Sequence, residues 1–240
     1  MNRIGSFDPR IADPDVFPTD MPPEEVMYIL ERLGCIWLYD GDICREKPHA
    51  VLTHETCSNG YIDCSRALCF PNICQVMGRQ LADRLVAEGV KRVDCVIGVP
   101  NGATILAYEV ARTYGVPHFF AVKLEDLIDQ SKKRIVWRGV QLPRGATVLI
   151  VEDAITTGGS IRELRHAIKK ENEEPVNILD TVGAIVHRPS HLPMTYGDMK
   201  VIPLLEREIK TFKPDKCPYC KAGSPRLHPR DHWQELTGKS

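Results

Sequence analysis

Residues 148–161 read VLIVEDAITTGGSI, an apolar run followed by two acids, two threonines, two glycines and a serine. The apolar start predicts a strand that is buried on both faces. The glycines and the serine predict a turn that exposes backbone N–H groups at the start of a helix. This strand–turn–helix unit decides the fold, because it is the clearest of several such units along the chain.

Segments on both sides of this unit repeat its alternation of helix and strand. An apolar face at helical spacing predicts helices, and short apolar runs predict strands. Helices are expected within residues 72–89, 102–115 and 159–173, and strands within residues 93–100, 116–123, 146–153, 177–188 and 200–206. Alternation of this kind predicts an α/β fold with a mainly parallel sheet flanked by helices.

The chain divides into three expected parts. Residues 1–70 would form an N-terminal arm, a helix near residues 23–37 and short antiparallel strands, and residues 71–205 would form the core. Residues 206–240 would form a C-terminal tail that joins the N-terminal strands in a small hood over the core. The charged segment at residues 124–145 is too long for an ordinary connection and is expected to be a lid-like loop.

Composition narrows the class of protein. The 240 residues are 43% hydrophobic, and 31 basic residues face 32 acidic ones for a formal net charge of −1. Such a chain can bury a sizeable core but has no global attraction to nucleic acid or to anionic membranes. No run of residues reaches the length of a membrane span, and no export signal is evident. We therefore expect a cytoplasmic protein without nucleic-acid or membrane partners.

The turn in the opening stretch has the features of a phosphate site. Gly158 and Gly159 let the backbone wrap closely around an anion, next to three hydroxyl side chains and the positive end of a helix. Glu152 and Asp153 would repel a phosphate but can accept hydrogen bonds from a neighbouring diol. An ordinary turn with solvated acids is the alternative, but the ordered series of residues favours a phosphorylated sugar.

The stretch resembles the phosphoribosyl pyrophosphate (PRPP) motif of the type I phosphoribosyltransferases. Members of this family transfer ribose 5-phosphate to or from a nitrogenous base with Mg²⁺. The resemblance implies that Glu152 and Asp153 bind the ribose hydroxyls. It also implies that the 5-phosphate is wrapped by Ala154, Ile155, Thr156, Thr157, Gly158, Gly159 and Ser160. The Mg²⁺ would be held mainly by PRPP, so we assign it no protein ligand.

Two further segments fit the same resemblance. The loop after the preceding strand is expected to bind pyrophosphate through Val99, Pro100, Asn101 and Gly102. Lys123 falls where the family has a lysine near pyrophosphate, and Lys132, Lys133 and Arg138 of the long loop could clamp the same group. A plain turn, a surface lysine and a solvated charged loop are the respective alternatives.

Within the family the chain is most similar to the orotate phosphoribosyltransferases, over roughly residues 33–225. The base would then be orotate, met by Ser58, Asn59 and Tyr61 of the early loop. The early loop lacks the usual lysine, and the mobile loop differs from the usual one. A purine or nicotinate therefore remains an alternative base, and a non-catalytic PRPP or nucleotide sensor an alternative function. The resemblance also implies a homodimer.

Nine cysteines, an odd number without an export signal, are expected to be reduced thiols. Cys217 and Cys220 form a CxxC pair that is followed by His228 and His232, which are ligand types of a zinc site. The Cys-to-His spacing is short for a zinc finger, and Pro229 separates the histidines. The sequence therefore favours thiols that pack the tail on the core, with structural zinc as the alternative.

Overall fold

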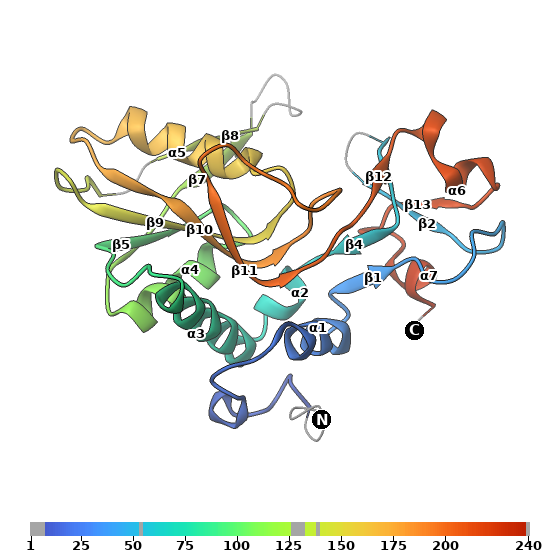
Figure 1. Ribbon diagram of the computed structural model, residues 1–240, viewed down its shortest axis with the longest axis horizontal. Coiled ribbons are helices and arrows are strands. Elements are labelled where there is room, and N and C mark those ends of the chain that lie inside the picture. Colours follow the sequence, from blue (N-terminus) through green and yellow to red (C-terminus); the bar gives the residue numbers. More distant parts are fainter. Residues whose placement is uncertain (1–7, 53–54, 126–132, 138–139, 239–240) are drawn as a thin grey trace.

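A five-stranded parallel sheet forms the centre of the computed structural model, which describes residues 8–52, 55–125, 133–137 and 140–238. The strand order is β11-β10-β9-β5-β6 (Figure 1). The strands are β5 (Cys95–Gly98), β6 (His118–Phe120), β9 (Thr147–Ile155), β10 (Asn177–His187) and β11 (Lys200–Glu206). All four pairings are parallel. The predicted α/β class is confirmed.

Helices cover both faces of this sheet (Figure 1). One face carries α3 (Pro71–Ala87) and α4 (Thr104–Tyr114), with α1 (Pro23–Arg32) beside them, and the other carries α5 (Gly159–Glu171). Leu149 belongs to the core cluster of α3 and α4, and its neighbour Ile150 belongs to the cluster of α5. Successive side chains of a strand point to opposite faces, so a strand covered on both sides must be apolar throughout.

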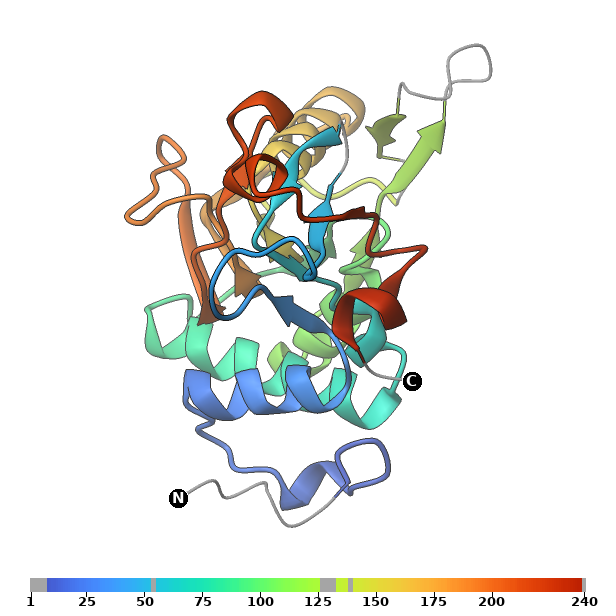
Figure 2. The ribbon, with the colours of Figure 1, turned by 90° about the vertical axis from the view of Figure 1, so that its right-hand side faces the viewer.

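Strands from the two ends of the chain build the hood. Its sheet has the order β12-β3-β2-β13, and β1 pairs separately with β4. The strands are β1 (Ile36–Leu38), β2 (His49–Val51), β3 (Cys57–Ser58), β4 (Gly60–Ile62), β12 (Thr211–Phe212) and β13 (Arg226–Leu227). Figure 2 shows the early blue strands and the late red segments side by side.

Short helices complete the chain. They are η1 (Pro14–Val16), α2 (Ser65–Leu68), η3 (Pro214–Lys216), α6 (Pro218–Lys221) and α7 (Trp233–Thr237). None of the helices in the described part of the chain has the length and apolarity needed to cross a membrane.

The segment at residues 124–145, expected to be one long loop, contains part of a hairpin. Strand β7 (Val122–Glu125) pairs antiparallel with β8 (Lys133–Val136), so the strand expected at residues 116–123 is divided at Ala121. Apolar side chains explain the difference, because Ile135 and Trp137 are buried in the cluster of α5. Their backbone N–H groups donate to carboxylates of α5 at 2.6 and 2.7 Å.

Close contact between α3 and α4 generates a first prediction. A Cβ added at Gly78 would lie 2.3 Å from Cβ of Glu109 and 3.1 Å from the backbone carbon of that residue. Gly78→Ala should therefore lower the free energy of unfolding by about 1–3 kcal/mol, the usual cost of overpacking. The ordinary preference of helices for alanine, about 1 kcal/mol, would otherwise make the change stabilising.

Urea unfolding followed by circular dichroism checks this prediction. Gly159→Ala is the matched control, because its Cβ would meet Thr157 Oγ1 at 3.6 Å, an ordinary contact. Equal stability of the two variants would show that α3 and α4 adjust without cost.

Candidate active site

The two predicted acids lie near the carboxyl end of β9, within the strand and not after it. Glu152 is buried, with 7% of its surface exposed, and its Oε1 accepts a hydrogen bond from the backbone N–H of Asp153 at 3.1 Å. Burial raises the pKa of Glu152 well above its ordinary value, and the negative charge of Asp153 raises it further. The positive charge of Lys123 opposes this shift of the pKa, so the predicted lysine acts electrostatically on Glu152.

The seven residues predicted to wrap a phosphate line one cavity of about 170 Å³ together with Glu152 and Ile161. Gly158 caps α5 in the left-handed region, with φ of 68°, and a Cβ there would lie 2.8 Å from Cε of Met199. Only glycine adopts this conformation without strain. The turn therefore presents the N-terminus of α5 to the cavity, as an anion site requires.

A chain of hydrogen bonds holds the backbone of this turn. The Tyr196 hydroxyl donates to the carbonyl of Thr156 at 2.7 Å, so it accepts from Nε2–H of His187 at 2.8 Å. Nδ1 of His187 lies 2.6 Å from a carboxylate oxygen of Glu206. These side chains come from β10, β11 and the segment between them, so the sheet itself fixes the position of the turn.

The predicted pyrophosphate loop lies beside the acids. Its residues Val99, Pro100, Asn101 and Gly102 connect β5 to α4, and the peptide bond between Pro100 and Asn101 is cis. A Cβ added at Gly102 would lie 2.8 Å from each oxygen of the Asp153 carboxylate. The absence of a side chain at Gly102 therefore lets the two predicted loops meet.

The basic residues of the long segment are only partly placed. Lys133 belongs to β8, where its backbone is opposite that of Glu125 in β7. Lys132 and Arg138 lie outside the described residues.

A second and larger cavity, of about 790 Å³, is lined by both the hood and the core. Tyr61 and Asp63 line it from the hood, and Asp153 and Thr156 line it from the core. His228 of the tail also lines it. A ligand bound in the phosphate cavity could extend into this one, because both are lined by Thr156 and its neighbours.

Two of the three hood residues predicted to meet the base have another place in the structure. The buried Ser58 hydroxyl lies 2.8 Å from the carbonyl oxygen of Gly60 and 3.0 Å from that of Lys210, and Oδ1 of Asn59 accepts from the N–H of Lys210 at 2.8 Å. Neither residue is among those that line the larger cavity, whereas Tyr61 is. The polar groups of Ser58 and Asn59 thus bind the tail to the hood, and their contact with the base stays a prediction.

Arg188 is among the lining residues of the larger cavity that were not predicted from the sequence. Arg188 directly follows β10, and its N–H donates to the carbonyl of Ile155 at 2.8 Å. Its Nε is buried and has no hydrogen-bond partner among the described residues, and burial lowers the pKa of its guanidinium. One feature of the sequence could have indicated Arg188: it lies at the end of an expected strand, at the edge of the sheet that also carries the acids.

Comparisons with known proteins agree with this geometry. The sequence model of the phosphoribosyl transferase domain matches residues 72–212. The orotate phosphoribosyltransferase of Caldanaerobacter subterraneus is 34% identical over 209 residues, which are 87% of this chain and 97% of the relative. The orotate phosphoribosyltransferase of Pelotomaculum thermopropionicum is 32% identical over the same shares of the two chains.

Solved structures show the same fold at lower identity. The orotate phosphoribosyltransferase from Aeropyrum pernix has a TM-score of 0.53 at 20% identity, and covers 75% of this chain and 93% of its own. The enzyme from Mycobacterium tuberculosis, in complex with inorganic phosphate, has a TM-score of 0.50 at 21% identity, with 76% and 94% covered. By its domain match and its relatives, the chain belongs to the phosphoribosyltransferase family, within the group of the orotate phosphoribosyltransferases.

Proposed function

We propose that the chain transfers the phosphoribosyl group of PRPP to orotate, giving orotidine 5′-phosphate and pyrophosphate for pyrimidine nucleotide biosynthesis. Arg188 carries this proposal, because it lines the larger cavity and its buried Nε has no hydrogen-bond partner among the described residues. A buried charge is costly unless it is paired, and a carboxylate is the natural partner of arginine. Orotate and nicotinate have a carboxylate that uracil and the purines lack, and the relatives favour orotate.

The two cavities divide PRPP between them. The 5-phosphate would bind the backbone N–H groups of the turn at Gly158 and Gly159, at the positive end of α5. The ribose hydroxyls would donate to Asp153, and the pyrophosphate would lie against the loop that ends at Gly102, which touches the same carboxylate. Lys123 would balance the negative charge of the leaving group.

Rupture of the bond to pyrophosphate develops positive charge on the ribose ring. A carboxylate next to the ring stabilises such a cation. Asp153 has this place because it lines the larger cavity at its boundary with the phosphate turn. The hood and Arg188 would hold the base on the other side of the ribose, so that its nitrogen is in line for attack.

The oxygen-rich edge around Asp153 is compatible with Mg²⁺, which proteins hold by one or two carboxylates together with substrate phosphates. When bound, Mg²⁺ would supply positive charge that offsets the negative charge developing on the leaving group. We therefore propose a magnesium-dependent enzyme in which Asp153 supports a metal held mainly by PRPP.

We also propose a homodimer. Three large apolar side chains, Ile105, Tyr108 and Phe120, are each more than half exposed, at 57, 55 and 57%. Tyr108 and Phe120 both lie against the ring of His118, so these two exposed side chains lie together at the edge strand β6. Apolar surface of this kind marks interaction sites. Such a surface supports the homodimer that the family resemblance implies.

A panel of bases tests the proposed reaction. Orotate, uracil, adenine, hypoxanthine, guanine and nicotinate are each incubated with PRPP and Mg²⁺, and release of pyrophosphate is followed. Orotate is expected to react in preference to the others, because it alone combines the required carboxylate with a pyrimidine ring. Release by a purine or nicotinate without release by orotate would contradict the assigned base. PRPP binding without reaction of any base would favour a sensor.

Arg188→Gln tests the residue that carries the proposal. Loss of a charge-assisted bond to the base should raise KM for orotate roughly 10- to 100-fold. The affinity for PRPP, measured by calorimetry, should change little. Arg165→Gln is the matched control, because Arg165 lies on α5, pairs with Asp180 at 3.0 Å and is not among the lining residues of the larger cavity. Equal effects of the two variants on KM would remove Arg188 from the site.

Glu152→Gln tests the buried acid through pH. The raised pKa means that the folded protein binds the proton more tightly than the unfolded one. Stability of the unliganded protein should therefore decrease as pH rises from the ordinary value of 4.5 through the raised pKa. Glutamine cannot ionise, so the variant should gain stability relative to the parent across this range while it loses roughly 10-fold or more in kcat/KM.

Urea midpoints at several pH values, measured without ligand, check this expectation. Glu88→Gln is the control, because Lys200 lowers the pKa of this exposed carboxylate. A pH profile of Glu152→Gln that runs parallel to that of the parent would contradict the raised pKa of Glu152.

A further inference from the structure

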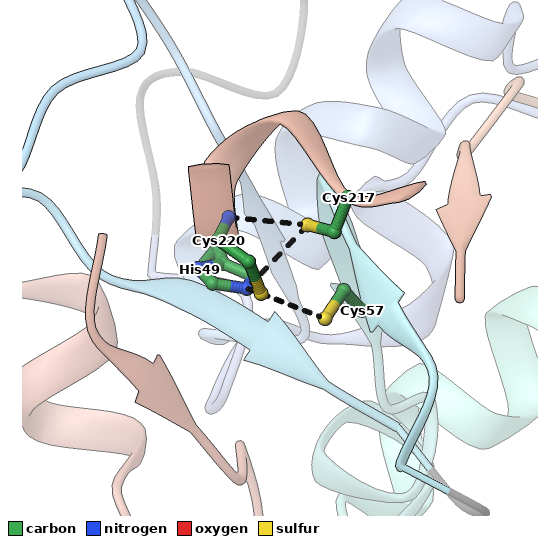
Figure 3. Close-up of side chains that lie close together, drawn as sticks. All are labelled: His49, Cys57, Cys217 and Cys220. Carbon is green, nitrogen blue, oxygen red and sulfur yellow. Dashed lines mark hydrogen bonds between the residues drawn. The ribbon is translucent and has the colours of Figure 1, made fainter. Parts of the chain in front are cut away.

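Three cysteines and a histidine come together in the hood, outside the two cavities. The Sγ atoms of Cys57, Cys217 and Cys220 and a ring nitrogen of His49 all lie within 4.8 Å of one another. Figure 3 shows the four side chains pointing toward a common centre. His49, Cys57 and Cys217 are fully buried, and Cys220 is half-buried.

The four residues come from both ends of the chain. His49 begins β2, Cys57 begins β3, Cys217 caps α6, and Cys220 lies within α6. Pairing of β2 with β13 and of β3 with β12 brings the tail to this place. The cluster is therefore a product of the hood sheet and lies at the joint between its two halves.

The distances between the side chains match a tetrahedral zinc site. Sγ of Cys57 lies 3.5 Å from Sγ of Cys220, and Nε2 of His49 lies 3.7 and 3.5 Å from the sulfurs of Cys217 and Cys220. Zinc–sulfur bonds of about 2.3 Å and zinc–nitrogen bonds of about 2.0–2.1 Å place neighbouring ligand atoms roughly 3.6–3.8 Å apart in a tetrahedron. All nine cysteines of the chain are free thiols.

The second shell fixes the tautomer of His49 that a metal requires. The Ser224 hydroxyl donates its proton to the carbonyl of Lys47 at 2.6 Å. It must therefore accept from Nδ1–H of His49 at 2.9 Å. Nε2 then carries a lone pair that faces the sulfurs, the arrangement in which a second hydrogen bond orients a metal-ligating histidine.

Further contacts suit a thiolate cluster. The backbone N–H of Cys220 donates to Sγ of Cys217 at 3.4 Å, a hydrogen bond that stabilises negative charge on sulfur. The ring of Tyr219 stacks on His49 with centroids 5.3 Å apart and closes one side. Without a metal, the single lone pair of Nε2 could accept from only one of the three thiols. A metal would satisfy all four groups at once.

We propose that His49, Cys57, Cys217 and Cys220 bind a structural zinc ion. Four protein ligands leave no open position for a substrate, so the ion would be structural and not catalytic. Thiolates with one imidazole favour zinc over the hard cations Mg²⁺ and Ca²⁺. The ion would join the tail to β2 and β3, and so hold the hood in place over the core, whichever base the enzyme uses.

A zinc site replaces the plain thiols that the sequence favoured, and it uses other histidines than those of the tail. His228 and His232, the histidines that follow the CxxC pair, have other contacts: they lie 3.7 Å from Glu55 and 2.7 Å from Glu235. The actual partners of Cys220 precede it by 171 and 163 residues. A rule based on the short spacing of metal ligands along the sequence cannot predict ligands that are so far apart.

Metal analysis of the full chain, purified without added zinc, is the first test. We expect one zinc per chain in the parent, and loss of the ion in Cys217→Ser, Cys57→Ser and His49→Ala. Cys69→Ser is the matched control, because Cys69 is an exposed thiol outside the cluster. It should retain the full zinc content.

Two measurements keep the test decisive if a ligand variant does not fold. His49→Cys should fold and retain zinc, because a four-cysteine site is an established alternative. X-ray absorption at the zinc edge of the parent should fit three sulfurs at about 2.3 Å and one nitrogen at about 2.0 Å. Zinc content near zero in the folded parent, zinc retained by His49→Ala and Cys57→Ser, or a disulfide between Cys57 and Cys220 found by mass spectrometry would overturn the proposal.

Discussion

Parallel pairing of β9 with β5 on one side and with β10 on the other is the constraint on which the site depends. Gly98, the last residue of β5, pairs with Val151, so β9 continues past its neighbour and carries Glu152 and Asp153 beyond it. On the other side, His187 pairs with Ile155, which places Arg188 at the same edge. A shift of this register by one residue would turn every side chain of β9 to the opposite face and separate these groups.

The strands and helices of the core could be predicted from the sequence, because buried parallel strands consist of continuous apolar runs. The sequence also predicted where the acid pair, the turn at residues 154–160 and the loop at residues 99–102 lie in the fold, since each follows such a run directly. The hairpin of β7 and β8 was missed because the apolar side chains of Ile135 and Trp137 become informative only when α5 is there to cover them.

Other features depended on contacts that no local pattern reveals. Ser58 and Asn59 have the polar groups of a ligand-binding loop, yet the same groups serve to bind the tail at Lys210. The sequence does not distinguish Arg188 from the other arginines, because only the structure shows that its Nε is buried without a partner among the described residues. The partners of Cys217 in the hood were hidden by distance along the chain, 168 residues in the case of His49.

The composition of the hood sheet also determines the order in which parts of the chain can fold during synthesis. A separation of 175 residues divides His49 from Ser224, so the first hood strands emerge long before the tail that completes their sheet. All strands of the core lie between these segments and can pair while synthesis is still in progress. Until the tail arrives, β2 and β3 present uncovered edges, a state that favours pairing with other chains. A nascent chain thus completes the turn at residues 154–160 early, and the hood wall of the larger cavity is the last part to form.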